Sequence, residues 1–241
     1  MSEVLNISEE FRVNGCASID SFLDRELCLG IAKDVIDLVN PLDLEETKEY
    51  ENFIVINTLK TPGQNPNNFE KPVINIRGSG GHDFRFVDIF KADDIFRSIP
   101  KQEIETYINK FLSSLGHRGA KIEYSVYYTT DVKVRGYHRD NALEGNKVLY
   151  KLFVYLTDVS DIDCGPTAFI EKTHNKEFCK QLASEINGAI SESGYDVNMN
   201  QRIFLGDAGM GILTTQNGIH RGFPQRGGKT RIMLVCKMRP Y

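Results

Sequence analysis

The clearest helical pattern in the first half of the chain lies between residues 24 and 40. Its apolar residues recur every three or four positions and therefore share one helical face: Leu27, Ile31, Val35 and Leu38. Asp24 can cap the first turn with its carboxylate, and Asn40-Pro41 can end the helix. The pattern predicts a helix over residues 24–40.

Two further stretches have helical spacing. Residues 93–115 carry Ile104, Ile108 and Phe111 on one face. Residues 176–191 repeat an apolar residue at every fourth position: Phe178, Leu182, Ile186 and Ile190. We expect a helix in each stretch.

Runs rich in aromatic and β-branched residues predict short strands, most of them after Gly119. The segment 60–84 is instead rich in Gly, Pro and Asn, which predicts a long loop of the kind that often forms a lid or binding loop. The predicted strands cover residues 53–57, 121–129, 148–156, 166–171, 211–215 and 230–238.

The order of these elements, helices first and then many short strands, predicts an α+β, mainly β protein built on a β-sandwich or barrel. We expect a single domain over residues 1–241. Its first part, about 1–118, should be helical, and its second part, about 119–241, should hold the strand-rich core.

Composition narrows the class of protein. The chain is 41% hydrophobic and 26% charged, as is usual for a soluble globular protein. A net charge of −4 argues against a nucleic-acid binder, which usually carries a basic excess. No signal peptide and no apolar run of about 18 residues is visible, so no membrane association is expected. The five cysteines are scattered without any CxxC, which favours reduced thiols in the cytoplasm.

The stretch GYHRDNALEGNK places His138, Arg139 and Asp140 side by side. A protein-kinase catalytic loop would need an asparagine five residues after the aspartate, and that position is Gly145. No DFG motif and no glycine-rich nucleotide loop accompanies it. The kinase interpretation is therefore excluded.

A metal site is the stronger interpretation of the same stretch. In an extended segment His138 and Asp140 point to one side, because strand side chains alternate. Two histidines with one carboxylate suit Fe(II) and leave coordination positions open. His220, in NGIHRGF just before the last predicted strand, can supply the second imidazole.

Arg231 stands at the head of the apolar strand RIMLVCKM. A guanidinium buried there needs an anionic partner, because an unpaired buried charge is costly. A dicarboxylic cosubstrate would supply one.

With these motifs the chain resembles the phytanoyl-CoA dioxygenase family of Fe(II)- and 2-oxoglutarate-dependent oxygenases, which includes ectoine hydroxylase-like enzymes. The resemblance covers most of the sequence. It rests on SFLDRELCLGIAKDVIDLV, FRFVDIFKADDIF, YHRD, YLTDVSDIDCGPTAFIEKTH and LGDAGMGILTTQNGIH. It implies a double-stranded β-helix (a cupin-like jelly roll) with flanking N-terminal helices.

The resemblance also implies an enzyme that uses Fe(II), 2-oxoglutarate and O2 to hydroxylate an unactivated C–H bond of a small molecule, releasing succinate and CO2. Related halogenases have Ala or Gly in place of the carboxylate ligand, so the presence of Asp140 favours hydroxylation. By the same resemblance, Arg231 binds the distal carboxylate of 2-oxoglutarate, and Tyr127 and Phe153 lie near the cosubstrate. The implied iron ligands are His138, Asp140 and His220.

The family usually has Pro-Gly-Ser-His where this chain has Glu171-Lys172-Thr173-His174. We interpret the difference as a changed turn, and we expect His174 to be structural instead of a metal ligand. His82 and His117 lie in glycine-rich segments and should face solvent.

Several alternatives stay open. The same chemistry could serve desaturation, cyclisation or epimerisation, or the chain could be a non-catalytic jelly-roll module that binds a ligand. Tyr127 and Phe153 could be plain core residues. Some of four arginines could receive an anionic substrate, or they could all be solvated surface charges: Arg77, Arg85, Arg139 and Arg221. Specificity should reside in the loops at 60–90 and 139–148.

Overall fold

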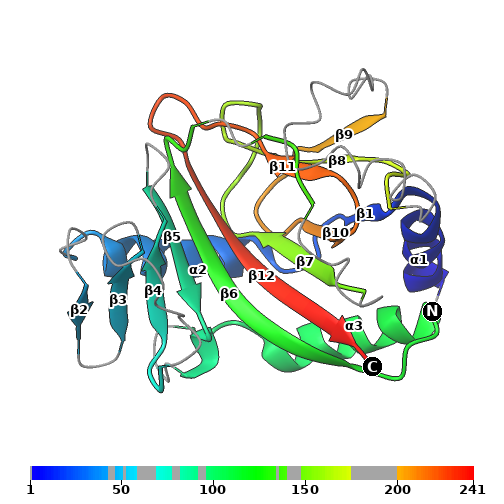
Figure 1. The fold of residues 1–241 in the computed structure, drawn as a ribbon, viewed down its shortest axis with the longest axis horizontal. Coiled ribbons are helices and arrows are strands. Elements are labelled where there is room, and N and C mark those ends of the chain that lie inside the picture. The colour runs from blue at the N-terminus through cyan, green and yellow to red at the C-terminus, as the bar shows by residue number, and fades with distance from the viewer. Residues whose placement is uncertain are drawn as a thin grey trace.

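The computed structural model describes residues 2–42, 47–50, 53–58, 69–77, 82–91, 96–133, 136–139, 148–174 and 200–241. Most of its strands form one nine-stranded sheet, in the order β1-β10-β7-β12-β6-β5-β4-β3-β2 (Figure 1). Neighbours pair antiparallel, except for β3 and β4, which are parallel. The strands span Cys16–Ile19 (β1), Lys48–Glu49 (β2), Ile54–Asn57 (β3), Val73–Ile76 (β4), His82–Val87 (β5), Ala120–Thr130 (β6), Tyr150–Tyr155 (β7), Gly211–Thr215 (β10) and Thr230–Pro240 (β12).

A second sheet has three strands in the order β11-β8-β9, all antiparallel. They span His220–Gly222 (β11), Thr167–Ile170 (β8) and Gln201–Phe204 (β9). Figure 1 shows this smaller sheet beside β7, β10 and β12. The Tyr155 hydroxyl links the two sheets, because it donates to the Phe204 carbonyl at 2.9 Å and accepts from the Thr167 N–H at 3.1 Å.

Helices α1 (Ser2–Asn14), α2 (Arg25–Val39) and α3 (Lys101–Ser114), with a short 3₁₀ turn at Ile89–Lys91, complete the described part. Asp24 caps α2 as predicted, since its Oδ1 accepts from the Leu27 N–H at 2.9 Å. The buried face of α2 includes Ile31 and Val35, and the helix passes behind the main sheet in Figure 1. Within the described part, no helix combines the length and the apolar character needed to cross a membrane.

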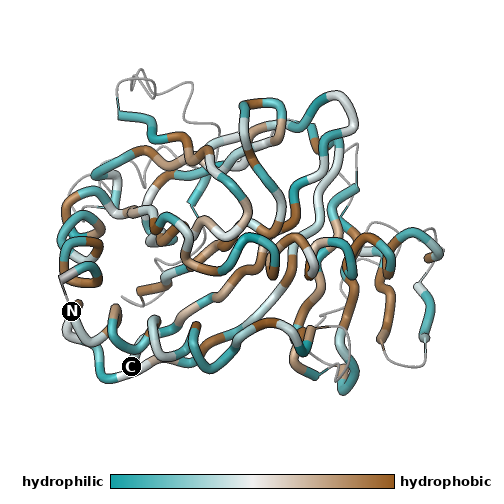
Figure 2. Tube along the Cα trace, turned by 180° about the vertical axis from the view of Figure 1, so that it is seen from behind, coloured by the Kyte–Doolittle hydropathy of each residue, from teal (hydrophilic) through white to brown (hydrophobic). Residues whose placement is uncertain are grey.

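Alternation along the strands divides the core in two. On one face of the main sheet, residues such as Val126 are buried in a cluster with helix residues such as Ile108. On the other face, Phe153 is buried in a cluster with Phe169 of the second sheet. In Figure 2, β3 and β4, which lie next to the edge strand β2, are largely brown, in agreement with their buried residues. The inner face between the two sheets is where the candidate site lies.

This arrangement confirms the expected jelly roll (double-stranded β-helix) with helices outside it. The predicted strands near residues 54, 125, 152, 168, 213 and 234 are all present. The helix predicted over 176–191 lies outside the described residues.

Three expectations need correction. The first 118 residues are not simply helical, because they contribute β1 to β5 to the main sheet. The predicted loop over 60–84 contains β4 and the start of β5, where pairing with neighbouring strands outweighs the local turn residues. The helix predicted from residue 93 begins only at Lys101, directly after Pro100. Proline is favoured at a helix start and cannot donate a hydrogen bond inside one.

Candidate metal and cosubstrate site

A cavity of about 590 Å³ opens on the inner face of the main sheet. It receives side chains from β5, β6, β7 and β12 on one side, and from β8, β11 and the segment 136–139 on the other. Five of the six residues that the sequence singled out for the site line this one cavity, although they come from five separate segments of the chain: Tyr127, His138, Phe153, His220 and Arg231.

Backbone pairing brings the two histidines together. The N–H of His138 donates to the His220 carbonyl at 3.0 Å, and the N–H of His220 donates to the His138 carbonyl at 3.0 Å. Their ring centroids are 4.6 Å apart, with the ring planes at 52°. The short strand β11 thus positions both imidazoles at the same end of the cavity.

The tautomer of each ring follows from its backbone partner. Nδ1 of His138 lies 3.0 Å from the Gly136 carbonyl, and Nδ1 of His220 lies 3.1 Å from the Gly218 carbonyl. A carbonyl only accepts, so Nδ1 of each ring donates. A neutral imidazole then carries its lone pair on Nε2, which is the arrangement that metal-binding histidines show when a backbone carbonyl orients them. The two rings fit the imidazole part of an iron site.

The proposed carboxylate ligand, Asp140, lies outside the described residues. Within the described ranges, no group of three His, Cys, Asp or Glu side chains is placed to hold a metal. The described part therefore supplies two candidate ligands.

Arg231 projects into the cavity from the start of β12, and only 7% of its surface is exposed. Its Nη1 donates to the Gly165 carbonyl. Gly222 lies directly beside the guanidinium: a Cβ there would be in van der Waals contact with it, 3.4 Å from Nη2 and 3.5 Å from Nη1, so only a larger side chain would crowd it. Gly165 has φ +74°, a conformation that favours glycine, and so the tight turn in DCGP helps to place the carbonyl.

The two predicted aromatic residues differ in their contacts. Tyr127 on β6 lies opposite Arg85 on β5, and its ring is 4.4 Å from the Arg85 guanidinium carbon. Phe153 on β7 is 6% exposed, and the Lys151 ammonium lies 5.9 Å from its ring. Tyr127 therefore supports an arginine as well as lining the cavity.

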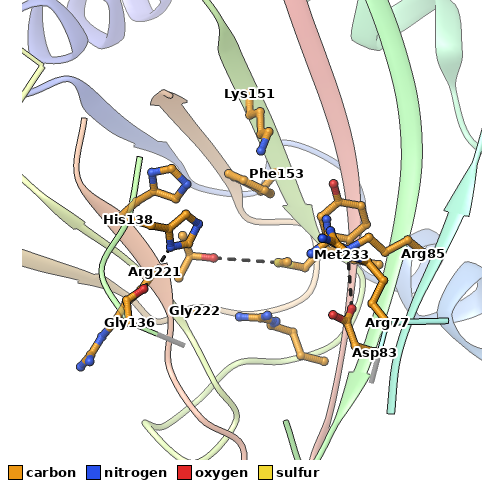
Figure 3. A pocket seen from close by; sticks show the side chains of 14 residues that line it. Arg77, Asp83, Arg85, Gly136, His138, Lys151, Phe153, Arg221, Gly222 and Met233 are labelled. Carbon is orange, nitrogen blue, oxygen red and sulfur yellow. Dashed lines mark hydrogen bonds and ion pairs between the residues drawn. The ribbon is translucent and has the colours of Figure 1, made fainter. Parts of the chain in front are cut away.

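The cavity lining is strongly cationic. Among the described residues that line it there is one carboxylate, Asp83, against four basic side chains that can face the cavity: Arg77, Arg85, Lys151 and Arg231. Arg221 also lines the cavity, but it alternates with His220 and Gly222 on β11, and its guanidinium packs on Tyr137 and Phe223 instead. Figure 3 shows Arg77, Arg85 and Asp83 on the side across from His138 and Arg221. Arg139 is not part of the lining, because its Nη2 faces the Thr173 carbonyl at 3.4 Å.

Sequence reasoning missed four lining side chains, namely Asp83, Lys151, Thr167 and Met233. Three of them were within reach of the alternation rule. Lys151 is two residues from Phe153, Asp83 is two residues from Arg85, and Met233 is two residues from Arg231, so each shares a strand face with a residue already singled out.

The other histidines lie away from the cavity. His174 has Nε2 3.1 Å from the Arg12 carbonyl, and burial lowers its pKa, as suits a structural residue. His82 is exposed, as expected, but it begins a strand instead of lying in a loop. His117 was expected to face solvent. It is half-buried, because its Nε2 lies 3.1 Å from the Tyr150 hydroxyl.

Comparison with known proteins identifies the fold. No protein-family model and no curated protein sequence matches the chain. Solved structures do match over nearly its whole length. The alpha-ketoglutarate-dependent non-heme epimerase SnoN of nogalamycin biosynthesis has a TM-score of 0.66 at 15% identity, over 99% of this chain and 81% of SnoN.

Two other solved structures match over a similar length. HygX from Streptomyces hygroscopicus, with nickel and 2-oxoglutarate bound, has a TM-score of 0.59 at 13% identity, over 98% of this chain and 86% of HygX. EvdO2 from Micromonospora carbonacea var. aurantiaca has a TM-score of 0.65 at 11% identity, over 98% of this chain and 91% of EvdO2. The chain therefore has the jelly-roll fold of a group of structures that includes non-heme 2-oxoglutarate-dependent enzymes.

Proposed function

We propose that this protein is an Fe(II)- and 2-oxoglutarate-dependent dioxygenase that hydroxylates an unactivated C–H bond of a small molecule. The observation that carries the proposal is the convergence of His138, His220 and the buried Arg231 on one cavity. The fold supports it, since HygX, with the same fold, has been solved with 2-oxoglutarate bound.

In this proposal His138, Asp140 and His220 hold Fe(II). When bound, the metal supplies the activation of O2, and the balanced reaction converts 2-oxoglutarate, O2 and R–H into succinate, CO2 and R–OH. The backbone bridge between the histidines fixes their separation, and the Gly136 and Gly218 carbonyls fix the ring orientations. The protein therefore holds these two proposed ligands in position through its own hydrogen bonds.

Arg231 holds the distal carboxylate of 2-oxoglutarate. A buried guanidinium can form two parallel charge-assisted hydrogen bonds to a carboxylate, which orients the cosubstrate along the cavity. Tyr127 and Phe153 flank the cosubstrate and exclude water from it. Each side chain contributes binding or orientation, and none of the three moves a proton.

We also propose that residues 1–241 form a single dioxygenase domain of the phytanoyl-CoA dioxygenase type. Strands from the first part pair directly with the core, as β1 does with β10 and β5 with β6. The four described cysteines are unpaired and buried, which supports the cytoplasm as the site of action: Cys16, Cys28, Cys164 and Cys236.

Epimerisation is the second candidate, because SnoN, which has the same fold, is an epimerase. Both reactions would use the same metal and cosubstrate. They differ in the product, since hydroxylation adds one oxygen atom to the substrate and epimerisation leaves its mass unchanged.

Anaerobic calorimetry of 2-oxoglutarate with the Fe(II)-loaded protein tests the proposal. We expect binding that requires the metal and falls at least about 100-fold in His138→Ala and His220→Ala, because each removes a proposed ligand. His82→Ala is the matched control, since His82 is exposed and outside the cavity. Oxygen consumption and succinate formation with a library of small molecules, followed by product mass, then separate hydroxylation from epimerisation.

Two results would count against the proposal in different ways. Absence of metal-dependent 2-oxoglutarate binding would remove both enzyme candidates. Metal-dependent binding without oxygen consumption for any compound would favour the non-catalytic binding module.

A further inference from the structure

One wall of the cavity carries a cluster of charged side chains that has no part in the proposed binding of metal and cosubstrate. Arg85 and Asp83 lie two residues apart on β5, and the N–H of Arg77, just past the end of β4, donates to the Asp83 carbonyl at 2.8 Å. Side chains two residues apart on a strand share a face, and all three residues line the cavity. Figure 3 shows them together, across the cavity from His138. The cluster is therefore placed to contact a second ligand of the same cavity.

Arg85 is the buried arginine of this cluster. Its side chain is only 20% exposed, and its guanidinium carbon lies 4.4 Å from the centroid of the Tyr127 ring on β6. Its ion pair with Asp83 joins Nε to Oδ1 at 3.6 Å, which is too long for a hydrogen bond. No hydrogen bond joins its guanidinium to any described residue. In the described part of the chain, contact with the aromatic ring thus holds the guanidinium while its five N–H donors stay available to a ligand.

The charge balance of the cavity indicates the sign of that ligand. Among the described residues, four basic side chains can face the cavity and one carboxylate, Asp83, opposes them. Fe(II) with its proposed ligand Asp140 would add one positive charge, and 2-oxoglutarate would bring two negative charges, so the loaded cavity would keep an excess of two positive charges. A buried charge is costly unless an opposite charge is near, so this excess favours an anion. The whole protein has a net charge of −4, which makes the excess a local feature.

We propose that the primary substrate is a small anion whose carboxylate or phosphate group is bound by Arg85, with Arg77 beside it, while Arg231 holds 2-oxoglutarate. Both kinds of group accept two parallel hydrogen bonds from a guanidinium. The anchored group lies at the wall across from His138, so the carbon that reacts belongs to the end of the substrate away from its anionic group. This rests on the proposed function, because it assigns Arg231 to the cosubstrate.

Calorimetric titration of the protein, loaded with Fe(II) and saturated with 2-oxoglutarate under anaerobic conditions, provides the test. Benzoate and phenyl phosphate serve as probes, because they place a carboxylate or a phosphate on the same ring, and uncharged benzamide is the matched control ligand. We expect at least one anionic probe to bind more tightly than benzamide. Tighter binding of phenyl phosphate assigns the phosphate class, and tighter binding of benzoate assigns the carboxylate class.

Arg85→Gln should weaken the binding of that probe about tenfold, because it removes the buried charge and the planar fork. Arg77→Gln should weaken it about threefold, because Arg77 is exposed and solvent screens its charge. Arg226→Gln is the matched control variant, because it removes the same charge from a side chain that is 75% exposed and outside the cavity lining. It should leave the affinity unchanged.

Arg85→Lys keeps the positive charge beside Asp83 and loses the planar fork, so it should weaken the binding about threefold. Thermal unfolding of each variant verifies that it folds. If Arg85→Gln does not fold, the comparison of Arg85→Lys with the control variant takes its place.

The proposal is overturned if neither anionic probe binds more tightly than benzamide, or if the Arg85 variants bind the probe as Arg226→Gln does. A loss in the Arg85 variants with no change in Arg77→Gln overturns the part assigned to Arg77. Failure of the proposed function would look different. The protein would not bind 2-oxoglutarate, whereas the anionic probes would still bind the metal-free protein in a manner that depends on Arg85.

Discussion

The Tyr155 hydroxyl connects β7 of the main sheet to the second sheet through two hydrogen bonds, so the loss of folding stability on its removal can be calculated. It sits between the N–H of Thr167 on β8 and the carbonyl of Phe204 on β9, with bonds of 3.1 and 2.9 Å. Tyr155 is fully buried, and burial raises the pKa of its phenol, which stays neutral and can both donate and accept.

Tyr155→Phe keeps the ring and deletes both hydrogen bonds. Each bond contributes about 1 kcal/mol net, and a buried N–H or carbonyl left without a partner costs about 1–3 kcal/mol. The free energy of unfolding should therefore fall by about 2–4 kcal/mol. For a chain of this size that corresponds to a fall in Tm of about 5–15 °C.

Tyr128→Phe is the matched control. Tyr128 is on the opposite face of the main sheet, its ring stacks on Phe84 at 5.5 Å, and its hydroxyl makes no hydrogen bond to the described residues. The same chemical change there should alter stability by no more than about 0.5 kcal/mol. Urea denaturation of both variants measures the difference, and equal effects would refute the role assigned to the Tyr155 hydroxyl.

Three further predictions address α2, the cosubstrate pocket and alkaline pH. Gly30 is at an exposed position in α2, with nothing within 4 Å of where a Cβ would stand. Gly30→Ala should therefore raise the free energy of unfolding, measured by urea denaturation, by about 0.5–1 kcal/mol. A loss of stability would contradict the helix assignment. Gly222→Val should weaken 2-oxoglutarate binding about tenfold in calorimetry by displacing the Arg231 guanidinium, and unchanged affinity would refute that contact. Burial raises the pKa of Cys28 from 9.0 to about 11, so the folded protein keeps a proton that the unfolded chain loses, and stability should fall as pH rises from 9 to 11. Cys28→Ala should make the dependence of the unfolding free energy on pH less steep, by the amount that corresponds to about one bound proton. An unchanged pH dependence would show that Cys28 does not contribute.

The parts of the fold that sequence predicted are those that local chemistry determines. The helix α2 carries its own cap in Asp24 and its own apolar face, so no distant residue is needed to define it. The long strands β6 and β12 are rich in β-branched and aromatic residues. In contrast, β4 and β5 are surrounded by turn residues, and only their pairing with each other and with β6 makes them strands. Helix α1, with a largely polar sequence, was not predicted because its packing against β1 and α3 is tertiary.

The candidate site, too, was predictable only in part. His138, His220 and Arg231 could be predicted from the sequence, because their residue types and motifs suggested metal and carboxylate binding. The placement of Arg85 against Tyr127 depends on the register between β5 and β6, which the sequence does not reveal. For Arg139 the sequence was misleading. Its position beside His138 suggested a role in the cavity, but its side chain faces the Thr173 carbonyl.

The pairing of β1 with β10 has a consequence for how the protein is made. Residues 16–19 leave the ribosome roughly 190 residues before their partner, residues 211–214, is synthesised. Contacts of such long sequence separation form slowly, and an unpaired strand edge can associate with other chains meanwhile. A cell producing this protein must keep β1 from mispairing until β10 has been synthesised.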